Sequence, residues 1–235
     1  MEKQIYKDAN AAADGFAQYL LSKHKSQDSL TVALSGGSTP KILFDLLASK
    51  YLNEIDWSKI HLYWGDERCV PPTDDDSNYK MTVEHLISKI NIPEANIHRV
   101  LGENLPDDEA DRYGALLNKN LQSINDIPAF DIIILGIGTD GHTASIFPHE
   151  IELMNSPSVC AVGINPDSGQ KRVTLTGPVI NNAKSICFLA TGASKAEKLT
   201  EIFNKTGNYK TYPAAHVSPT HGELIWFMDE SASIQ

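Results

Sequence analysis

The sequence lacks the features that mark disulfide-linked, secreted or membrane-spanning proteins. Its 235 residues include three cysteines and no CxxC pair, which favours reduced thiols over a disulfide framework. No apolar run approaches the roughly 20 residues that a transmembrane helix needs. The N-terminal segment MEKQIYKDAN contains no apolar core of a signal peptide. These absences predict a cytoplasmic protein that does not enter a membrane.

Positive charge is scarce as well. Lys and Arg number 20 and Asp and Glu number 30, which gives a formal net charge of −10. A surface this acidic repels the phosphate backbone, so we expect no nucleic-acid partner. An anionic substrate would need a local cluster of cations set against this overall field.

What the sequence does contain is an alternation of short apolar runs with amphipathic segments. Strands are predicted at 30–34, 59–64, 130–135, 158–163, 172–176, 185–190 and 223–228. Helices are predicted at 8–24, 77–90, 107–124 and 194–204, with one more beginning near Pro40. Ser194 and Glu197 have the spacing of a capping box for the last helix. This order predicts a single α/β domain over 1–235, with an open, mostly parallel sheet and helices on both faces.

Ligands of open α/β sheets bind beyond the carboxyl ends of the strands, and the unusual loops of this chain follow predicted strands. The first such loop contains Gly36, Gly37 and Ser38 and leads into a helix. Adjacent glycines and free N–H groups at a helix start suit an anion, but the GK[ST] ending of a Walker A loop is absent. The loop is compatible with phosphate binding and equally with a plain turn.

A second loop, WGDERCVPP, follows the strand predicted at 59–64. Arg68 has the fork geometry that binds a phosphate or carboxylate, and Asp66 can orient a base or the arginine itself. The alternative is an ordinary solvated charged loop.

A third loop, Gly136 to Gly141, satisfies GxGxxG directly after the strand predicted at 130–135. A dinucleotide site is nevertheless disfavoured, because Pro148 prevents the long helix that should follow and the next strand does not end in an acid. The loop instead presents His142 with Asp140 two residues before it. A histidine among glycines at the end of a core strand is a candidate general base.

Two further cations stand at element boundaries. Arg172 begins a predicted strand, and Lys195 stands near the start of the last predicted helix. A lysine there opposes the helix dipole, so either it turns into solvent or an anion sits between it and the helix end. No HExxH motif or other metal-ligand spacing is present, and no GxSxG nucleophile elbow.

Together these segments resemble the 6-phosphogluconolactonase family. The resemblance rests on ALSGGSTP, WGDERCVPP followed by SNY, LGIGTDGHTASIFP, RVTLTGPVIN, ATGASKAEKL, PAAHVSP and ELIWFMDESA, in the family's order over roughly residues 30–232. It implies a fold related to glucosamine-6-phosphate isomerase/deaminase. It also implies hydrolysis of 6-phospho-D-glucono-1,5-lactone to 6-phospho-D-gluconate, in the oxidative pentose phosphate pathway, with neither metal nor organic cofactor.

The resemblance also assigns roles to the loop residues. His142 falls on the catalytic histidine, and either Asp140 or Asp66 would hold its tautomer. The basic positions that face the substrate are Arg68, Arg172 and Lys195. The phosphate-side loop positions are Gly36, Gly37 and Ser38.

Three other functions are weighed against this one. A glucosamine-6-phosphate deaminase of the same superfamily resembles IAFNEP after DGH, where this chain has TASIFP. A sugar-phosphate sensor of the transcription-regulator type would need a basic DNA-binding segment, which is absent. A dehydrogenase is the weakest alternative, for the reasons given for the GxGxxG loop.

Overall fold

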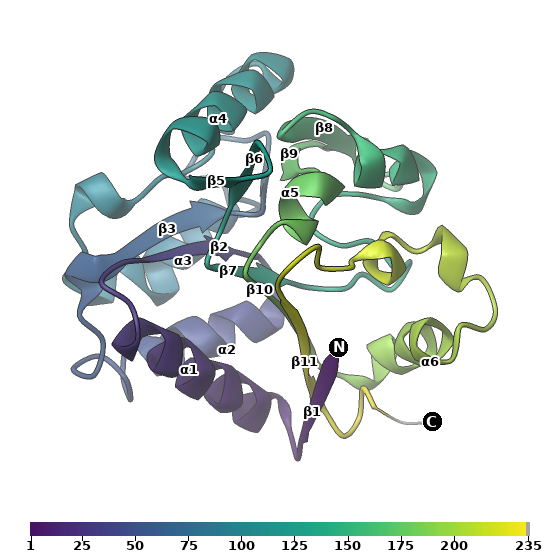
Figure 1. The fold of residues 1–235 in the computed structure, drawn as a ribbon, viewed down its shortest axis with the longest axis horizontal. Coiled ribbons are helices and arrows are strands. Elements are labelled where there is room, and N and C mark those ends of the chain that lie inside the picture. Colours follow the sequence, from purple (N-terminus) through teal and green to yellow (C-terminus); the bar gives the residue numbers. More distant parts are fainter. Residues whose placement is uncertain (234–235) are drawn as a thin grey trace.

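The computed structural model describes residues 1–233. Its centre is a six-stranded, entirely parallel sheet in the order β1, β11, β10, β7, β2, β3 (Figure 1). The strands are Glu2–Tyr6 (β1), Leu30–Leu34 (β2), Ile60–Trp64 (β3), Ile132–Leu135 (β7), Ser185–Ala190 (β10) and Glu223–Asp229 (β11). The predicted parallel sheet is confirmed. The prediction missed β1, because this edge strand is largely exposed and carries no apolar pattern.

The strand order brings two glycine-rich loops together. β2 and β7 are neighbours, and Val32 pairs with Ile132. The chain leaves β2 toward β3 on one side and leaves β7 toward β10 on the other. Such a reversal opens a crevice beyond the carboxyl ends of two adjacent parallel strands. The loops that follow β2 and β7 both border this crevice.

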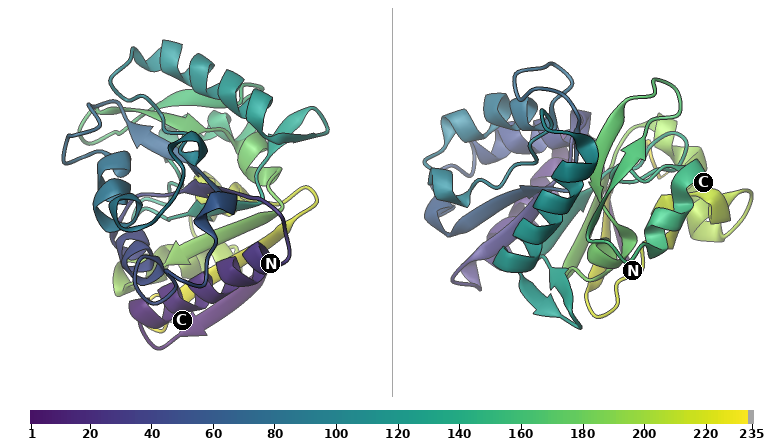
Figure 2. Two further views of the ribbon diagram at one scale, coloured as in Figure 1. Left: turned by 90° about the vertical axis from the view of Figure 1, so that its left-hand side faces the viewer. Right: turned by 90° about the horizontal axis from the view of Figure 1, so that it is seen from above.

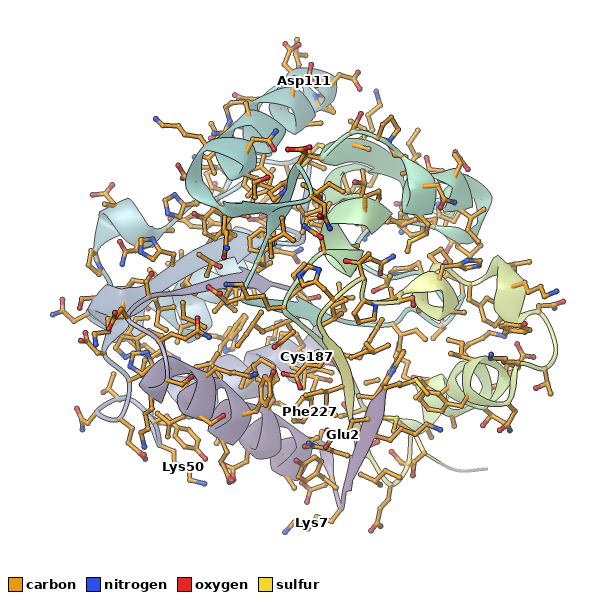
Figure 3. All side chains as sticks on the ribbon, in the orientation of Figure 1. Glu2, Lys7, Lys50, Asp111, Cys187 and Phe227 are labelled. Carbon is orange, nitrogen blue, oxygen red and sulfur yellow. The ribbon has the colours of Figure 1, made fainter. Side chains whose placement is uncertain are left out.

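Helices α1 (Ala9–Lys25) and α2 (Ser38–Leu47) cover one face of the sheet, below it in Figure 1. α1 begins where the side chain of Asp8 accepts a hydrogen bond from the N–H of Ala11 at 2.8 Å. Figure 3 places Cys187 of β10 and Phe227 of β11 in the interior near this helix, and both are fully buried.

The opposite face carries α4 (Pro106–Asn120), α5 (Gly177–Asn181) and a small antiparallel sheet. The left view of Figure 2 shows α4 and α1 on opposite sides of the strands. The small sheet has the order β4, β9, β8, with bounds Asp66–Arg68, Lys171–Leu175 and Cys160–Ile164. The strands predicted near 158–163 and 172–176 exist, but they belong to this second sheet. Their pairing is antiparallel, which the apolar pattern alone does not specify.

Two predicted helices are shorter than expected. α4 stops at Asn120, and residues 122–124 form β5 (Gln122–Ile124) of a hairpin with β6 (Ile127–Ala129). The turn between them places Asn125 and Asp126 at φ of 52° and 62°, a conformation that these two residue types tolerate well.

The helix predicted at 77–90 is α3, Asn78–His85, followed by a 3₁₀ helix over Ile87–Lys89. It ends because Leu86 leaves the helical region, at φ −134° and ψ −66°. The remaining 3₁₀ helices lie at Trp57–Lys59, Glu94–Asn96, Pro148–Asn155, Ala193–Lys195, Tyr209–Thr211 and Pro213–His216.

The predicted capping box of the last helix is wrong. α6 spans Ala196–Asn204, and its N-cap is Lys195, which makes no side-chain capping bond. Gly192, at φ 94°, turns the chain into the 3₁₀ helix, so Ser194 lies inside that turn rather than at the start of α6.

The buried apolar side chains form one cluster that includes residues of both sheets and of the helices on each face. Across residues 1–233, no helix is long and apolar enough to cross a membrane. The last two residues of the domain predicted over 1–235 lie outside the described part of the chain.

Candidate active site

A cavity of about 310 Å³ lies at the crevice between the loops after β2 and β7. Its lining comes from six separate segments: Ser35, Gly36, Gly37, Asp66, Arg68, Asn78, Gly136, Ile137, Gly138, Thr139, His142, Ala144, Arg172 and Lys195. Seven of the nine residues predicted for the site line it. The other two are Asp140, which contacts His142, and Ser38, which begins α2.

His142 is held by its own loop. Its Nδ1 lies 2.6 Å from Oδ1 of Asp140, and its backbone N–H donates to the same oxygen at 3.1 Å. The two side chains fold over Gly138, where a Cβ atom would come within 2.1 Å of the imidazole Nδ1, so only glycine fits there. Because the Asp140 carboxylate can only accept, Nδ1 of the neutral ring donates its N–H to it, and the free lone pair of the ring lies on Nε2.

The Asp140 carboxylate is stabilised in its charged form. Burial raises the pKa of Asp140, but the hydrogen bonds and the charge of His142 outweigh this, and the pKa lies below its ordinary value. A carboxylate that stays ionised holds the imidazole in one tautomer.

The loop of His142 is supported from two sides. The ring of Phe147 lies 4.8 Å from the imidazole, between centroids. On the far side, Ala214 donates its N–H to the carbonyl of Gly141 at 3.1 Å. Ala144, which lines the cavity, has a φ of 48°. A non-glycine residue in this region stores strain, and such strain concentrates at functional sites.

Asp66 lines the cavity but makes no hydrogen bond to His142 within residues 1–233. Its carboxylate accepts a hydrogen bond from Oγ of Ser145 at 2.6 Å, and the residue is only 6% exposed. Of the two acids left open from the sequence, Asp140 is therefore the one placed on the imidazole. A direct catalytic role of Asp66 stays a prediction.

Arg68 and Arg172 face each other across β4 and β9 as register partners. Nη1 of Arg68 donates to the carbonyl of Asp76 at 2.6 Å, and its Nε is buried without a partner in the described structure. Nε of Arg172 donates to Oε1 of Gln170 at 3.3 Å. Burial and the charge of Arg68 lower the pKa of Arg172. Two adjacent guanidinium groups favour an anion between them.

Lys195 reaches the same cavity from the start of α6. Burial lowers the pKa of this lysine, while the charge of Asp140 acts in the opposite direction. Within residues 1–233, the ion pairs present include none from Arg68, Arg172 or Lys195 to an acidic side chain. Three cations without ion-pair partners line the cavity together with the single carboxylate of Asp66, and this excess of positive charge favours an anion there.

The glycine loop after β2 forms another part of the cavity wall. A Cβ atom on Gly36 would come within 2.0 Å of Oδ1 of Asn78, so glycine lets the loop approach this side chain. The sequence analysis gave Asn78 no role, although Asn78 belongs to the SNY segment that follows the WGDERCVPP loop in the resemblance to the family. It also missed Thr139 and Ala144, whose only signal is their place in the loop of His142.

No group of three or more His, Cys, Asp or Glu side chains suited to a metal ion occurs in residues 1–233.

Comparisons with known proteins show the family of the chain. The family model described as glucosamine-6-phosphate isomerases/6-phosphogluconolactonase matches residues 6–226. The 6-phosphogluconolactonase of Treponema pallidum is 44% identical over 86% of this chain and 84% of its own length. That of Haemophilus influenzae is 40% identical over 95% of both chains.

Solved structures give the same result. The structure of 6-phosphogluconolactonase from Trypanosoma brucei superposes with a TM-score of 0.88 at 27% identity, over 99% of this chain and 97% of the other. The fold prediction is therefore confirmed. The chain is an enzyme of the glucosamine-6-phosphate isomerase/6-phosphogluconolactonase family, to which its similar relatives named 6-phosphogluconolactonase also belong.

Proposed function

We propose that this chain hydrolyses 6-phospho-D-glucono-1,5-lactone to 6-phospho-D-gluconate, the second step of the oxidative pentose phosphate pathway. The observation that carries the proposal is the shared cavity. It combines a histidine paired with a carboxylate and three cations that lack acidic partners. A base and an anion anchor are the two elements that a phosphorylated lactone requires.

In this mechanism His142 is the general base. Nε2 takes a proton from a water molecule as the water oxygen attacks the lactone carbonyl carbon. The resulting imidazolium is stabilised by Asp140 through Nδ1. When the bond between carbonyl carbon and ring oxygen breaks, the ring oxygen receives the proton from Nε2 and becomes a hydroxyl group. A δ-lactone is an activated ester, so this exchange proceeds without a covalent enzyme intermediate.

The phosphate is the anchor of the substrate, far from the bond that breaks. Arg68, Arg172 and Lys195 supply the positive charge, and Gly36 and Gly37 bring backbone N–H groups to the same cavity. Binding energy from this remote group then orients the lactone carbonyl toward His142.

A pH-stat assay tests the proposal. Freshly prepared lactone is added at constant pH, and the acid released is corrected for spontaneous hydrolysis. We expect the wild type to release acid well above the spontaneous rate and His142→Asn to release it near that rate. A wild-type rate equal to background overturns it.

Ammonia release from glucosamine 6-phosphate would assign the chain instead to the isomerase/deaminase activity that the family description includes. A cytoplasmic location stays a prediction.

A further inference from the structure

Glu67 lies between two residues of the cavity and is itself outside it. Asp66 and Arg68 on either side line the cavity, and alternation along β4 turns the Glu67 side chain to the other face. There the residue is only 2% exposed. A buried carboxylate without a cationic partner is costly unless several hydrogen-bond donors surround it.

Four donors surround the Glu67 carboxylate. Oε1 accepts from the backbone N–H groups of Arg68 at 2.7 Å and Asn78 at 2.8 Å. Oε2 accepts from the N–H of Tyr79 at 2.7 Å and Oγ of Ser77 at 3.1 Å. Three of the four donors belong to one segment, 77–79, at the start of α3. Glu67 thus fastens this segment to the strand that carries Arg68.

The fastened segment touches the cavity through Asn78. The Asn78 side chain, 4% exposed, donates to the carbonyl of Asp66 at 3.0 Å and stands against Gly36. Three neighbours therefore fix Asn78 in the wall: Glu67 through the backbone N–H, Asp66 through the side-chain amide, and Gly36 by close contact.

The residue before this segment, Asp76, contacts Arg68 directly and is linked to Arg172 through Gln170. Its carbonyl accepts from Nη1 of Arg68, and its Oδ2 accepts from Nε2 of Gln170 at 2.8 Å. Oε1 of the same Gln170 accepts from Nε of Arg172. Asp76 adjoins the fastened segment, so a shift of residues 77–79 would displace the partners of both guanidinium groups.

We propose that Glu67 is a positioning residue of the anion site: it fixes residues 76–79 and thereby orients Arg68, Arg172 and Asn78. The inference rests on the proposed function only for the identity of the anion. Glu67 contacts neither the cavity nor His142, so it acts on binding rather than on the proton transfer.

The test is Glu67→Gln, which keeps the size of the side chain but places an NH₂ group against two of the four donors. We expect KM for the lactone and the inhibition constant for inorganic phosphate to rise together by about tenfold, the effect of one displaced charge-assisted contact. The value of kcat and its dependence on pH should stay near those of the wild type, because His142 and Asp140 are untouched.

Asp131→Asn is the matched control. Asp131 is also a largely buried carboxylate with several donors, Thr31 and Lys184, but it lies at the amino ends of the strands. It should lose thermal stability without a change in KM. If Glu67→Gln does not fold, Ser77→Ala leaves the carboxylate and removes one of its donors, together with the N-cap acceptor that Ser77 provides for the N–H of Lys80. It should raise KM and the phosphate constant by a smaller, parallel factor.

A Glu67→Gln enzyme that is less stable but has the KM and phosphate inhibition of the wild type would overturn the proposal and leave Glu67 a structural role. A fall in kcat at unchanged KM would overturn it as well. If the wild type shows no lactonase activity, the proposed function fails. The inference about Glu67 is then tested by the affinity for inorganic phosphate, measured by ³¹P NMR, which should be weaker in Glu67→Gln than in the wild type; equal affinities would overturn it.

Discussion

The two ends of the central sheet handle charge in opposite ways. At the amino ends, Lys23 pairs with Glu223 at 2.8 Å, and Lys184 pairs with Asp131 at 2.9 Å. At the carboxyl ends, the three cations of the cavity have no acidic partner within residues 1–233, and one guanidinium nitrogen, Nε of Arg68, is buried without any partner.

The side-chain networks of the two ends differ as well. Several polar side chains at the amino ends join short, closed networks, such as Tyr19 OH at 2.6 Å from Oε1 of Glu223. The carboxyl ends carry the strained Ala144 and the close approaches at Gly36 and Gly138, while Gly222 makes a similar close approach near the amino ends. Unpaired charge and strain are unfavourable in the free protein, and a bound anion would offset the first of them. The cations without ion-pair partners support the proposed anion site at the carboxyl ends.

The largest effect should come from His142→Ala. Loss of a general base lowers kcat by about 10²–10⁴-fold. The wild-type rate should rise with pH through a single ionisation that the variant lacks, as initial rates across a pH series will record. Inhibition by inorganic phosphate should stay unchanged, since the cations are intact. His142→Asn retaining most of the wild-type kcat would contradict the assignment and leave Asp66 as the next candidate base.

Arg68→Ala and Lys195→Ala should have the next largest effect. Each removes a cation that forms no ion pair within residues 1–233 and would bind the substrate phosphate, at a cost of about 1.5–3 kcal/mol in kcat/KM. Steady-state kinetics should place the loss mainly in KM, with weaker inhibition by phosphate or sulfate. Unchanged KM in both variants would make these residues ordinary surface charges, like the paired cations at the other end.

These particular residues show how far the sequence alone could go. The contact of His142 with Asp140 spans two positions, so local spacing could predict it. The facing of Arg68 and Arg172 depends on an antiparallel register between segments more than 100 residues apart, and no local pattern encodes such pairing.

The same limit explains the missed roles of Glu67 and Asn78. Their contacts join the end of β3 and β4 to the start of α3 across a loop of polar residues. The apolar strands, by contrast, were found within a few residues because burial on both faces produces continuous apolar runs. The core was therefore predictable, while the polar networks needed the tertiary structure.

At the amino ends, Asp131→Ala should change stability and not catalysis. It leaves the N–H of Thr31 and the ammonium of Lys184 without their acceptor, and an unsatisfied group of this kind costs about 1–3 kcal/mol. Chemical denaturation will measure the loss, and kcat/KM should equal that of the wild type. A fall in kcat/KM in the folded variant would show that residues at the amino ends of the strands also affect catalysis, contrary to the comparison made above.

The pH dependence of stability gives a smaller test of the amino-end pairing. Burial raises the pKa of Glu223, but hydrogen bonds from Lys23, Tyr19 and Ser185 outweigh it and hold the pKa below the ordinary value. A lowered pKa means that the unfolded chain binds the proton more tightly, so the stabilisation is present above the ordinary carboxylate range and is lost as pH falls through the lowered value. Melting temperatures across this acidic window should fall less steeply for Glu223→Gln than for the wild type.

The smallest expected effect concerns the strain beside His142. Ala144 has a φ of 48°, where an L-residue with a Cβ is disfavoured by about 1–2 kcal/mol and glycine is not. Glycine adds about 0.5–1 kcal/mol of chain entropy to the unfolded state, so Ala144→Gly should raise stability by only about 0.5–1 kcal/mol. Its matched control is Ala48→Gly, at φ −75°, where no strain is relieved and stability should fall. If both variants lose stability alike in urea denaturation, the loop of His142 stores no strain. If Ala144→Gly alone gains stability and kcat falls slightly, the strain serves to hold the loop in its working conformation.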